Sequence, residues 1–390
     1  MTAVVTAVRG RRDTTAFIRL PYRVYREDPH WVAPLERERR AFLNPRRNPF
    51  FDFGTAELFL ARRGDEVVGR IAAVIDPRYN ARHHPGHGLF GLFECVDDVQ
   101  TAEALFTAAA DWLRGRGMTA VLGPLSFSTN EECGLLTEGF DSPPTVMMAH
   151  NPPYYQRLLT ECGFAKAKDL WSWRLPMPRE GELPPVFDRV GDRARSRQNV
   201  TIRPLDPKRF DEDMAQVKEI YNAAWSQNWA SVPLTDREFD HLLAELKPVL
   251  RPELVILAQV DGDPAAFTMW LPDANQALRA ARGRLTTFGL PTGLVRMARA
   301  ARRIDRVRAV AGGAKEKYRH SGLVPAVLAQ AHRAAHRLGY RETEFSWVLE
   351  DNAQSNRVIQ ATGAVRFRTH RLYQRAIDPA DTRPQERGTP

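Results

Sequence analysis

The order of predicted elements repeats along the chain, and this repeat constrains the fold more than any other feature. Each half begins with two apolar runs around a Gly/Asp turn, the pattern of a β-hairpin. A short strand, a helix with helical apolar spacing and another strand follow. These segments are 57–62, 67–75, 90–95, 101–114 and 119–122 in the first half, and 254–260, 264–270, 307–311, 324–338 and 343–349 in the second. The repeat predicts an α+β fold with two similar domains in tandem, each a mixed twisted sheet flanked by helices.

The domain boundary is predicted from length and proline content. A chain of 390 residues exceeds the size at which a single hydrophobic core usually keeps growing. Residues 176–185 carry four prolines among charged residues, and 193–199 are polar and basic. We therefore expect a first domain over 1–185, a second over 196–378 and a flexible tail over 379–390.

Cysteine usage and hydropathy exclude several classes of protein. Cys95, Cys133 and Cys162 are odd in number and widely spaced, which argues against a disulfide framework and for a reducing compartment. No apolar run approaches the roughly 20 residues that span a bilayer, and residues 1–15 lack the apolar region of a secretory signal. The histidines of 83–87 have no acidic or cysteine partner nearby, so no metal site is expected. The protein is expected to be cytoplasmic.

Nearly all of the net charge of +9 comes from one segment. Residues 279–308 contain nine arginines and a single acid, Asp305, with apolar residues such as Leu290 and Leu294 between them. A basic segment with apolar anchors suits an anionic membrane surface or an acidic ligand. The alternative is a solvated helical face. The first interpretation predicts peripheral contact with the inner membrane through 279–308.

Two strings in the second half are candidates for a binding site. Arg319 and Gly322 stand at the start of a predicted helix, where backbone N–H groups and the helix dipole favour a phosphate. Further along, Asn352 or Asp351 is placed to cap a short helix beginning near Ala353, and Gly363 is placed to end it.

Together these strings resemble the acyl-CoA signatures of the GNAT superfamily of N-acyltransferases. The loop R/Q-x-x-G-x-G/A appears as 319–324, with Val324 in place of a small residue, and the N-x-x-A helix begins at Asn352. The resemblance implies that the amides of 317–324 cradle the CoA pyrophosphate, that Asn352 approaches the pantetheine arm, and that strands 265–270 and 307–311 hold the acyl arm. The residues implied in acyl-CoA binding are Lys317, Tyr318, Arg319, His320, Ser321, Gly322, Leu323, Val324, Asn352, Ser355 and Asn356.

The first half resembles the second but lacks its loop. Residues 151–164 are similar to the N-x-x-A helix, whereas Asp97 and Asp98 occupy the turn where the pyrophosphate would bind. Two carboxylates there would repel a pyrophosphate. The first half is therefore interpreted as a degenerate GNAT-like domain that contributes surface to the protein and does not bind CoA.

Further strings resemble the tandem GNAT proteins called YghO-like, over about 17–375. They are 28–34, 48–51, 123–126, 138–141 and 151–155. Some members of this group are bacterial ceramide synthases, which transfer a fatty acyl group from acyl-CoA to the amine of a sphingoid base. The resemblance implies acyl-CoA as co-substrate with no permanently bound cofactor, a lipid amine as acceptor and no nucleic-acid partner.

Catalytic roles are assigned as hypotheses. Aminolysis of a thioester needs a group that removes a proton from the amine. Asp273 and Asn275 follow a strand where the acceptor is expected to approach, although Asp273 after Pro272 is also typical of a turn. Glu350 is a further carboxylate near the predicted cleft. Ile359 stands where many GNAT relatives have a tyrosine that reprotonates the thiolate, so Tyr373 is the nearest candidate acid. The alternative is that Tyr373 is a half-buried structural residue.

Four tryptophans are expected to pack in cores or at the domain interface: Trp171, Trp173, Trp225 and Trp229. Trp225 and Trp229 are also candidates for lining a lipid groove.

Three other functions are compatible with the same residues. The first is acetylation of a small amine or a protein N-terminus, which needs no wide apolar tunnel. The second is tRNA-dependent aminoacyl transfer, with 279–308 as an RNA contact; the intact CoA loop argues against it. The third is a non-catalytic acyl-CoA-binding protein that docks on membranes, in which Ile359 marks lost chemistry.

Overall fold

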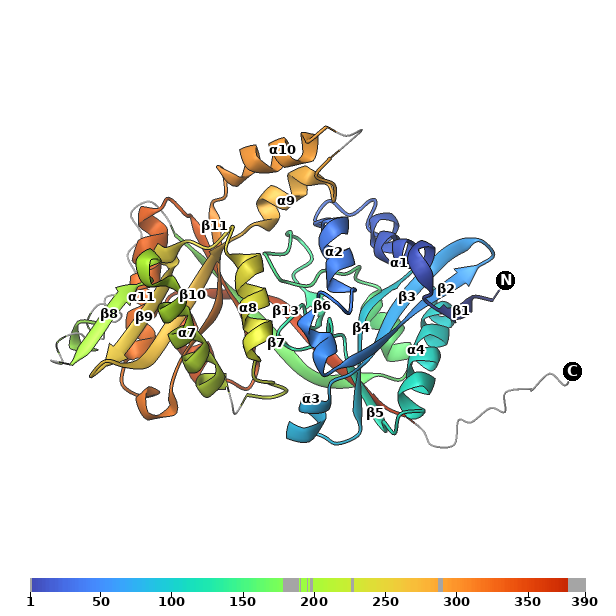
Figure 1. The fold of residues 1–390 in the computed structure, drawn as a ribbon, viewed down its shortest axis with the longest axis horizontal. Coiled ribbons are helices and arrows are strands. Elements are labelled where there is room, and N and C mark those ends of the chain that lie inside the picture. The colour runs from blue at the N-terminus through green and yellow to red at the C-terminus, as the bar shows by residue number, and fades with distance from the viewer. Residues whose placement is uncertain are drawn as a thin grey trace, which may run out of the picture.

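The computed structural model describes residues 2–177, 189, 191–194, 196, 199–225, 228–286 and 290–377. Figure 1 shows the first half of the chain, blue to green, on the right and most of the second half, lime green to red, on the left, with β13 in the middle. The expected tail at 379–390 and most of the expected linker lie outside the described residues. No helix within the described ranges is long and apolar enough to cross a membrane.

The first half follows the predicted order with additions at its start. Its helices are α1 (Gly10–Val24), α2 (Glu36–Phe42), α3 (Pro77–Arg82), α4 (Val99–Arg114) and α5 (Tyr155–Glu161), with a 3-10 turn at Pro49–Asp52. Its strands are β1 (Val4–Ala7), β2 (Thr55–Arg63), β3 (Glu66–Ile75), β4 (His87–Cys95), β5 (Ala120–Gly123), β6 (Leu135–Glu138) and β7 (Ala165–Pro176). The predicted hairpin, helix and strands are confirmed within a few residues.

The second half repeats this plan. Its helices are α7 (Phe210–Trp225), α8 (Asp236–Leu246), α9 (Asn275–Ala281), α10 (Thr292–Ala301), α11 (Leu323–Arg337) and α12 (Ala353–Gln360), with 3-10 turns at Pro207–Arg209, Pro252–Leu254 and Glu316–Tyr318. Its strands are β8 (Val200–Pro204), β9 (Val255–Val260), β10 (Asp263–Pro272), β11 (Arg306–Ala314), β12 (Glu342–Leu349) and β13 (Val365–Ala376).

The two halves exchange their last strands. One sheet runs in the order β1-β2-β3-β4-β5-β13-β7-β12-β11-β10-β9-β8, with β6 paired to β13. The first half's β7 pairs with β12, from Glu342 opposite Pro176 to Leu349 opposite Leu170. The second half's β13 pairs with β5 of the first half, where Tyr373 lies opposite Gly123. A sequence boundary between 185 and 196 therefore does not separate two independent sheets.

Alternating side chains of β10 face two different cores. Ala266 and Trp270 belong to the core that includes the buried face of α11, whereas Phe267, Met269 and Leu271 belong to the core beneath α7 and α8. This period of two is what a strand covered by helices on both faces requires. The second half of the sheet is thus sandwiched between α11 and the α7–α8 pair.

The basic segment is divided by the fold. Arg308 on β11 is 4% exposed and donates to Ser346 and to the Val146 carbonyl, and Arg306 forms a 2.7 Å ion pair with Glu342. The expectation of one basic patch over 279–308 is therefore wrong at its C-terminal end, because strand residues turn into the sheet. Before the strand, α9 and α10 pack together and stand out from the body at the top of Figure 1.

Candidate active site

Strands β11 and β12 separate halfway along their length. They pair in parallel only from Arg306–Glu342 to Ala309–Phe345, although β11 continues to Ala314 and β12 to Leu349. The two strands line a slot of about 130 Å³, with Val310 and Ala311 on one side and Ser346 and Val348 on the other. Separated strand edges can offer backbone N–H and C=O groups to an extended, amide-bearing arm.

The slot lies between β11 and β12 rather than between β10 and β11. No gap opens between 265–270 and 307–311, because β10 and β11 stay hydrogen-bonded from Ala266–Ala314 to Pro272–Val307. Residues of both strands, among them Phe267, Val310 and Ala311, nevertheless line the slot. A shared set of residues, including Gly312, Val324, Asn352 and Ser355, joins the slot to an open groove of about 740 Å³.

The groove is built around the start of α11. Gly322 caps this helix with a φ of +83°, a backbone conformation that glycine adopts without strain. Gly322, Val324 and Pro325 line the groove, so the positive end of the helix dipole lies at its wall. Arg319 and His320 add polar and cationic groups beside it. This arrangement fits a phosphate-bearing ligand.

The structure brings together part of the predicted binding set. The residues that line the groove are Arg319, His320, Gly322, Val324, Asn352 and Ser355. The other predicted residues have different surroundings. Lys317 pairs with Asp263 over 3.4 Å, the Ser321 hydroxyl donates to the Tyr318 carbonyl, and Leu323 is buried in the core. Tyr318 packs against the same core.

Two asparagines shape the second wall of the groove. The Asn352 side chain accepts a 3.1 Å hydrogen bond from the Ser355 N–H and so caps α12 as predicted. Asn356 is buried, accepts from the Trp173 indole over 3.1 Å and donates to the Leu349 carbonyl over 3.0 Å. Asn356 therefore holds α12 against the end of β12 instead of lining the groove.

The predicted acceptor-side residues join the two halves. Asp273 is 1% exposed, and its carboxylate accepts from the Val146 N–H over 2.9 Å and from the Asn275 N–H over 3.2 Å. Burial raises the pKa of Asp273 to about 7; Arg306 lowers it and Glu344 raises it further. Asn275 donates to the Pro144 carbonyl over 3.0 Å. Neither residue lines the slot or the groove.

Glu350 and Tyr373 also lie apart from these cavities. Glu350 pairs with Lys166 over 2.7 Å and accepts from the Asp169 N–H over 3.0 Å. Tyr373 belongs to the core of the first half, because the strand exchange carries β13 out of the second half. Ile359 lines the slot without a hydroxyl group to donate a proton.

A second, apolar cavity, called the chamber below, lies next to the inner end of the slot. It occupies about 80 Å³ between α7, α8 and the sheet, and its wall includes Val217, Leu242, Leu246 and Met269. The residues that line both spaces are Trp225, Phe267, Val310, Ala311 and Trp347. Groove, slot and chamber thus lie next to one another in the second half and share lining residues.

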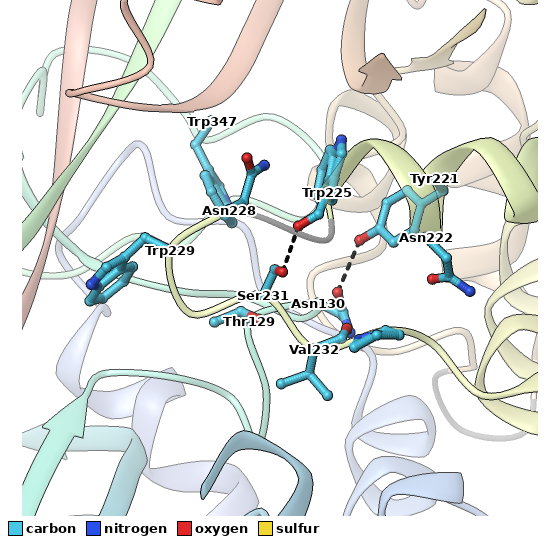
Figure 2. A pocket seen from close by; sticks show the side chains of 11 residues that line it. Thr129, Asn130, Tyr221, Asn222, Trp225, Asn228, Trp229, Ser231, Val232 and Trp347 are labelled. Carbon is cyan, nitrogen blue, oxygen red and sulfur yellow. Dashed lines mark hydrogen bonds between the residues drawn. The ribbon is translucent and has the colours of Figure 1, made fainter. Parts of the chain in front are cut away.

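The aromatic side of these cavities was missed in part by sequence reasoning. Figure 2 shows Trp225, Trp229 and Trp347 around a small cavity of about 20 Å³, next to Tyr221. Trp225 and Trp229 also line the groove at the start of α11, whereas Trp173 packs in the core; that the two tryptophans line a lipid groove stays a prediction. Trp347 and the glycines at 312 and 313 carried no motif; the Gly-Gly pair at the end of a predicted strand was the available signal.

The carboxylates in the turn of the first half are engaged by nearby side chains. Asp97 pairs with Arg157, and Asp98 pairs with Arg63 over 2.6 Å and accepts from the Thr101 hydroxyl. These contacts use the carboxylates to hold the turn together.

Comparison with known proteins identifies relatives along nearly the whole chain. The chain is 37% identical over 380 residues to a protein of Caulobacter vibrioides named bacterial ceramide synthase, covering 96% of this chain and 97% of that one. It is 34% identical over 381 residues to protein YghO of Escherichia coli, covering 96% and 95%. No protein-family model matches.

A solved structure supports the fold at much lower identity. A tandem GNAT protein from the clavulanic acid biosynthesis pathway superposes with a TM-score of 0.56 at 12% identity, covering 97% of this chain and all of that one. The length and degree of the two sequence matches show the family. The chain belongs to the YghO-like family of tandem GNAT N-acyltransferases.

Proposed function

We propose that the protein transfers a long-chain fatty acyl group from acyl-CoA to the primary amine of a sphingoid base, sphinganine or 3-ketosphinganine. The observation that carries this proposal is the succession of groove, slot and apolar chamber, each of which shares lining residues with the next. A relative named bacterial ceramide synthase, similar over nearly the whole chain, supports the acceptor class.

Each of these spaces suits one part of acyl-CoA. The groove at the start of α11 suits the pyrophosphate, with Gly322, Arg319 and His320 as its neighbours. The slot between β11 and β12 suits the amide-bearing pantetheine arm, which can pair with the free strand edges. The thioester then lies near the inner end of the slot, where Val310 and Ala311 meet Trp347.

The chamber favours a long chain over an acetyl group. An acetyl group ends at the thioester, so its transfer does not require an apolar space beyond. Here the space continues between α7, α8 and β10, with Val217, Phe239, Leu242, Leu246 and Met269 on its walls. Burying methylene groups there stabilises a bound acyl chain by about 0.8 kcal/mol for each group removed from water.

The α9–α10 hairpin suits delivery of a lipid acceptor from an anionic membrane. Leu290, Leu294 and Val295 are exposed by 62%, 47% and 45%, which is unusual for large apolar side chains that lie together. Four arginines of the same helix and its end are exposed, and no ion pair with a described carboxylate holds them: Arg296, Arg299, Arg302 and Arg303. We infer peripheral binding at the inner face of the cytoplasmic membrane, a location consistent with three free, buried cysteines.

The proposal is tested by mass spectrometry of the product. Purified protein is incubated with palmitoyl-CoA and either sphinganine or 3-ketosphinganine, with acetyl-CoA as a parallel donor. We expect an amide from palmitoyl-CoA alone, and the relative yields rank the two acceptors. An amide from acetyl-CoA alone contradicts the long-chain donor and favours the small-group reaction. Binding of palmitoyl-CoA without any product contradicts the sphingoid acceptor.

A further inference from the structure

A loop of the first half reaches the chamber. It runs between β5 and β6, and its side chains are tied to the second half. Thr129 donates to the Ala230 carbonyl over 3.0 Å, while Asn130 accepts from the Tyr221 hydroxyl over 2.9 Å and donates to the Val232 carbonyl over 3.2 Å. Figure 2 shows the Asn130–Tyr221 contact beside Trp225. The next residue, Glu131, is therefore held at a defined place.

Glu131 lines two cavities that meet at its side chain. One is the apolar chamber. The other, of about 40 Å³, opens between the two halves, and its wall includes Phe42, Phe50 and Phe127. The residues common to both cavities are Asn130, Glu131, Leu234 and Leu242. Glu131 thus lies between the cavity that opens between the halves and the chamber wall at Val310, Ala311 and Trp347, so an acceptor amine that enters between the halves would pass Glu131 before it reaches the thioester.

Among the ionisable side chains of the chamber, Glu131 alone can serve as a base. The other two are Arg308 and Tyr221. Arg308 is a cation whose N–H groups are used by Ser346 and the Val146 carbonyl. Burial raises the pKa of Tyr221 well above its ordinary value, so its hydroxyl stays protonated and donates to Asn130.

We propose that Glu131, supplied by the half without a CoA loop, is the catalytic base that deprotonates the acceptor amine. This inference rests on the proposed function. The Glu131 carboxylate takes one proton from the acceptor ammonium, and the neutral nitrogen attacks the thioester carbonyl carbon. The C–N bond forms, the C–S bond breaks, and its electron pair leaves on sulfur. The second nitrogen proton passes to the thiolate, and Glu131 releases the first to solvent. The sum is ammonium plus thioester giving amide, free CoA thiol and one proton.

The electrostatic setting of Glu131 suits this role. Glu131 remains exposed to solvent, and partial desolvation by the surrounding cleft raises its pKa above the ordinary value of a glutamate. Glu245 and Glu238 on α8 and the neighbouring Glu132 raise it further, whereas Arg39 on α2 lowers it. His241 on α8 lines the same cavity between the halves. A carboxylate with a raised pKa is a stronger base than an ordinary one and is better matched to an ammonium group.

The test compares Glu131→Gln with Glu132→Gln. The neighbouring Glu132 faces Arg39 at 3.9 Å and lines neither the chamber nor the slot, so its variant is a matched control. For Glu131→Gln we expect unchanged palmitoyl-CoA affinity and a kcat lower by about 100-fold or more, the usual worth of a general base. For Glu132→Gln, which removes a charge that raises the pKa of Glu131, we expect turnover close to that of the wild type at a pH above that pKa and a lower apparent pKa in the pH profile.

The pH dependence separates a base from a structural residue. Wild-type kcat/KM should fall as the pH drops below about 8, because Glu131 becomes protonated. In Glu131→Gln this fall in kcat/KM should be absent, and only the pH dependence from the titration of the acceptor amine should remain. Wild-type turnover with an unchanged pH profile in Glu131→Gln overturns the inference. Loss of palmitoyl-CoA binding in Glu131→Gln assigns the residue a structural role and also overturns it. A wild type that forms no amide contradicts the proposed function itself.

Discussion

The Trp173 indole N–H donates a 3.1 Å hydrogen bond to the Asn356 side-chain oxygen, and this contact joins the two halves at the candidate site. Trp173 lies on β7, which the first half contributes to the exchanged strands, whereas Asn356 lies on α12, whose first turn lines the groove. The first half thus supports the position of a helix that the second half uses for binding.

Replacing Asn356 tests this support. Asn356→Ala leaves the Trp173 N–H without its buried partner, and such a group costs about 1–3 kcal/mol when unpaired, whereas the Leu349 carbonyl keeps its hydrogen bond from the Asn352 N–H. We expect the free energy of unfolding, measured by urea denaturation, to fall by about that amount and palmitoyl-CoA affinity to fall with it. Gln360→Ala, at an exposed position of the same helix, should change neither. An equal effect of the two variants would contradict the supporting role.

A charge placed at the start of α11 should abolish acyl-CoA binding. Gly322 has a positive φ and lines the groove, so Gly322→Glu adds backbone strain, bulk and a negative charge beside the expected pyrophosphate. We expect the Kd for palmitoyl-CoA, measured by calorimetry, to rise at least about 100-fold, or about 2.7 kcal/mol, while the circular dichroism spectrum is unchanged. Asp97→Ala in the corresponding turn of the first half is the control and should leave the Kd unchanged. A large loss in that variant would place the cofactor in the other half.

Local signals were sufficient to predict much of the groove. The cap at Asn352 and the helical spacing after Gly322 depend on residues close together in sequence, and the structure has both where they were expected. The same holds for the hairpins, whose strands pair across short turns.

Long-range pairing explains what the sequence did not reveal. Nothing in the local sequence around Tyr373 indicates that its strand joins the sheet of the first half. Glu131 and Trp347 likewise carry no motif, because they meet only when the two halves pack together. In the sequence Arg308 is part of a basic run, whereas in the structure its side chain is buried in the sheet on β11.

Charge reversal on the α9–α10 hairpin should weaken membrane binding. Arg299, Arg302 and Arg303 are exposed next to the apolar side chains of α10, and each basic residue near an anionic surface contributes about 1 kcal/mol. We expect the triple change to glutamate to reduce co-sedimentation with vesicles containing phosphatidylglycerol at low salt. Exposed Arg337 and Arg341, changed to glutamate, serve as the control. Equal binding of all three proteins would exclude this surface.

The difference in stability between the Glu131→Gln variant and the wild type should depend on pH in a defined direction. In the folded protein the pKa of Glu131 is about 8, whereas an unfolded glutamate titrates near 4.5. Between these values the folded state binds the extra proton, so this group lowers the stability of the wild type as the pH rises. Glutamine does not titrate and removes that loss.

The measurement is the melting temperature of both proteins from pH 4.5 to pH 8.5. We expect the two melting temperatures to be similar at the acidic end, where the folded glutamic acid is neutral like glutamine. As the pH rises to about 8, the melting temperature of the variant should increase relative to that of the wild type. Asp273, whose pKa is also raised by burial, is present in both proteins and cancels in the difference. A difference that stays constant over this range would show that Glu131 titrates as an ordinary carboxylate. Because no substrate is added, this result bears on the electrostatics of the cleft independently of which amine the enzyme acylates.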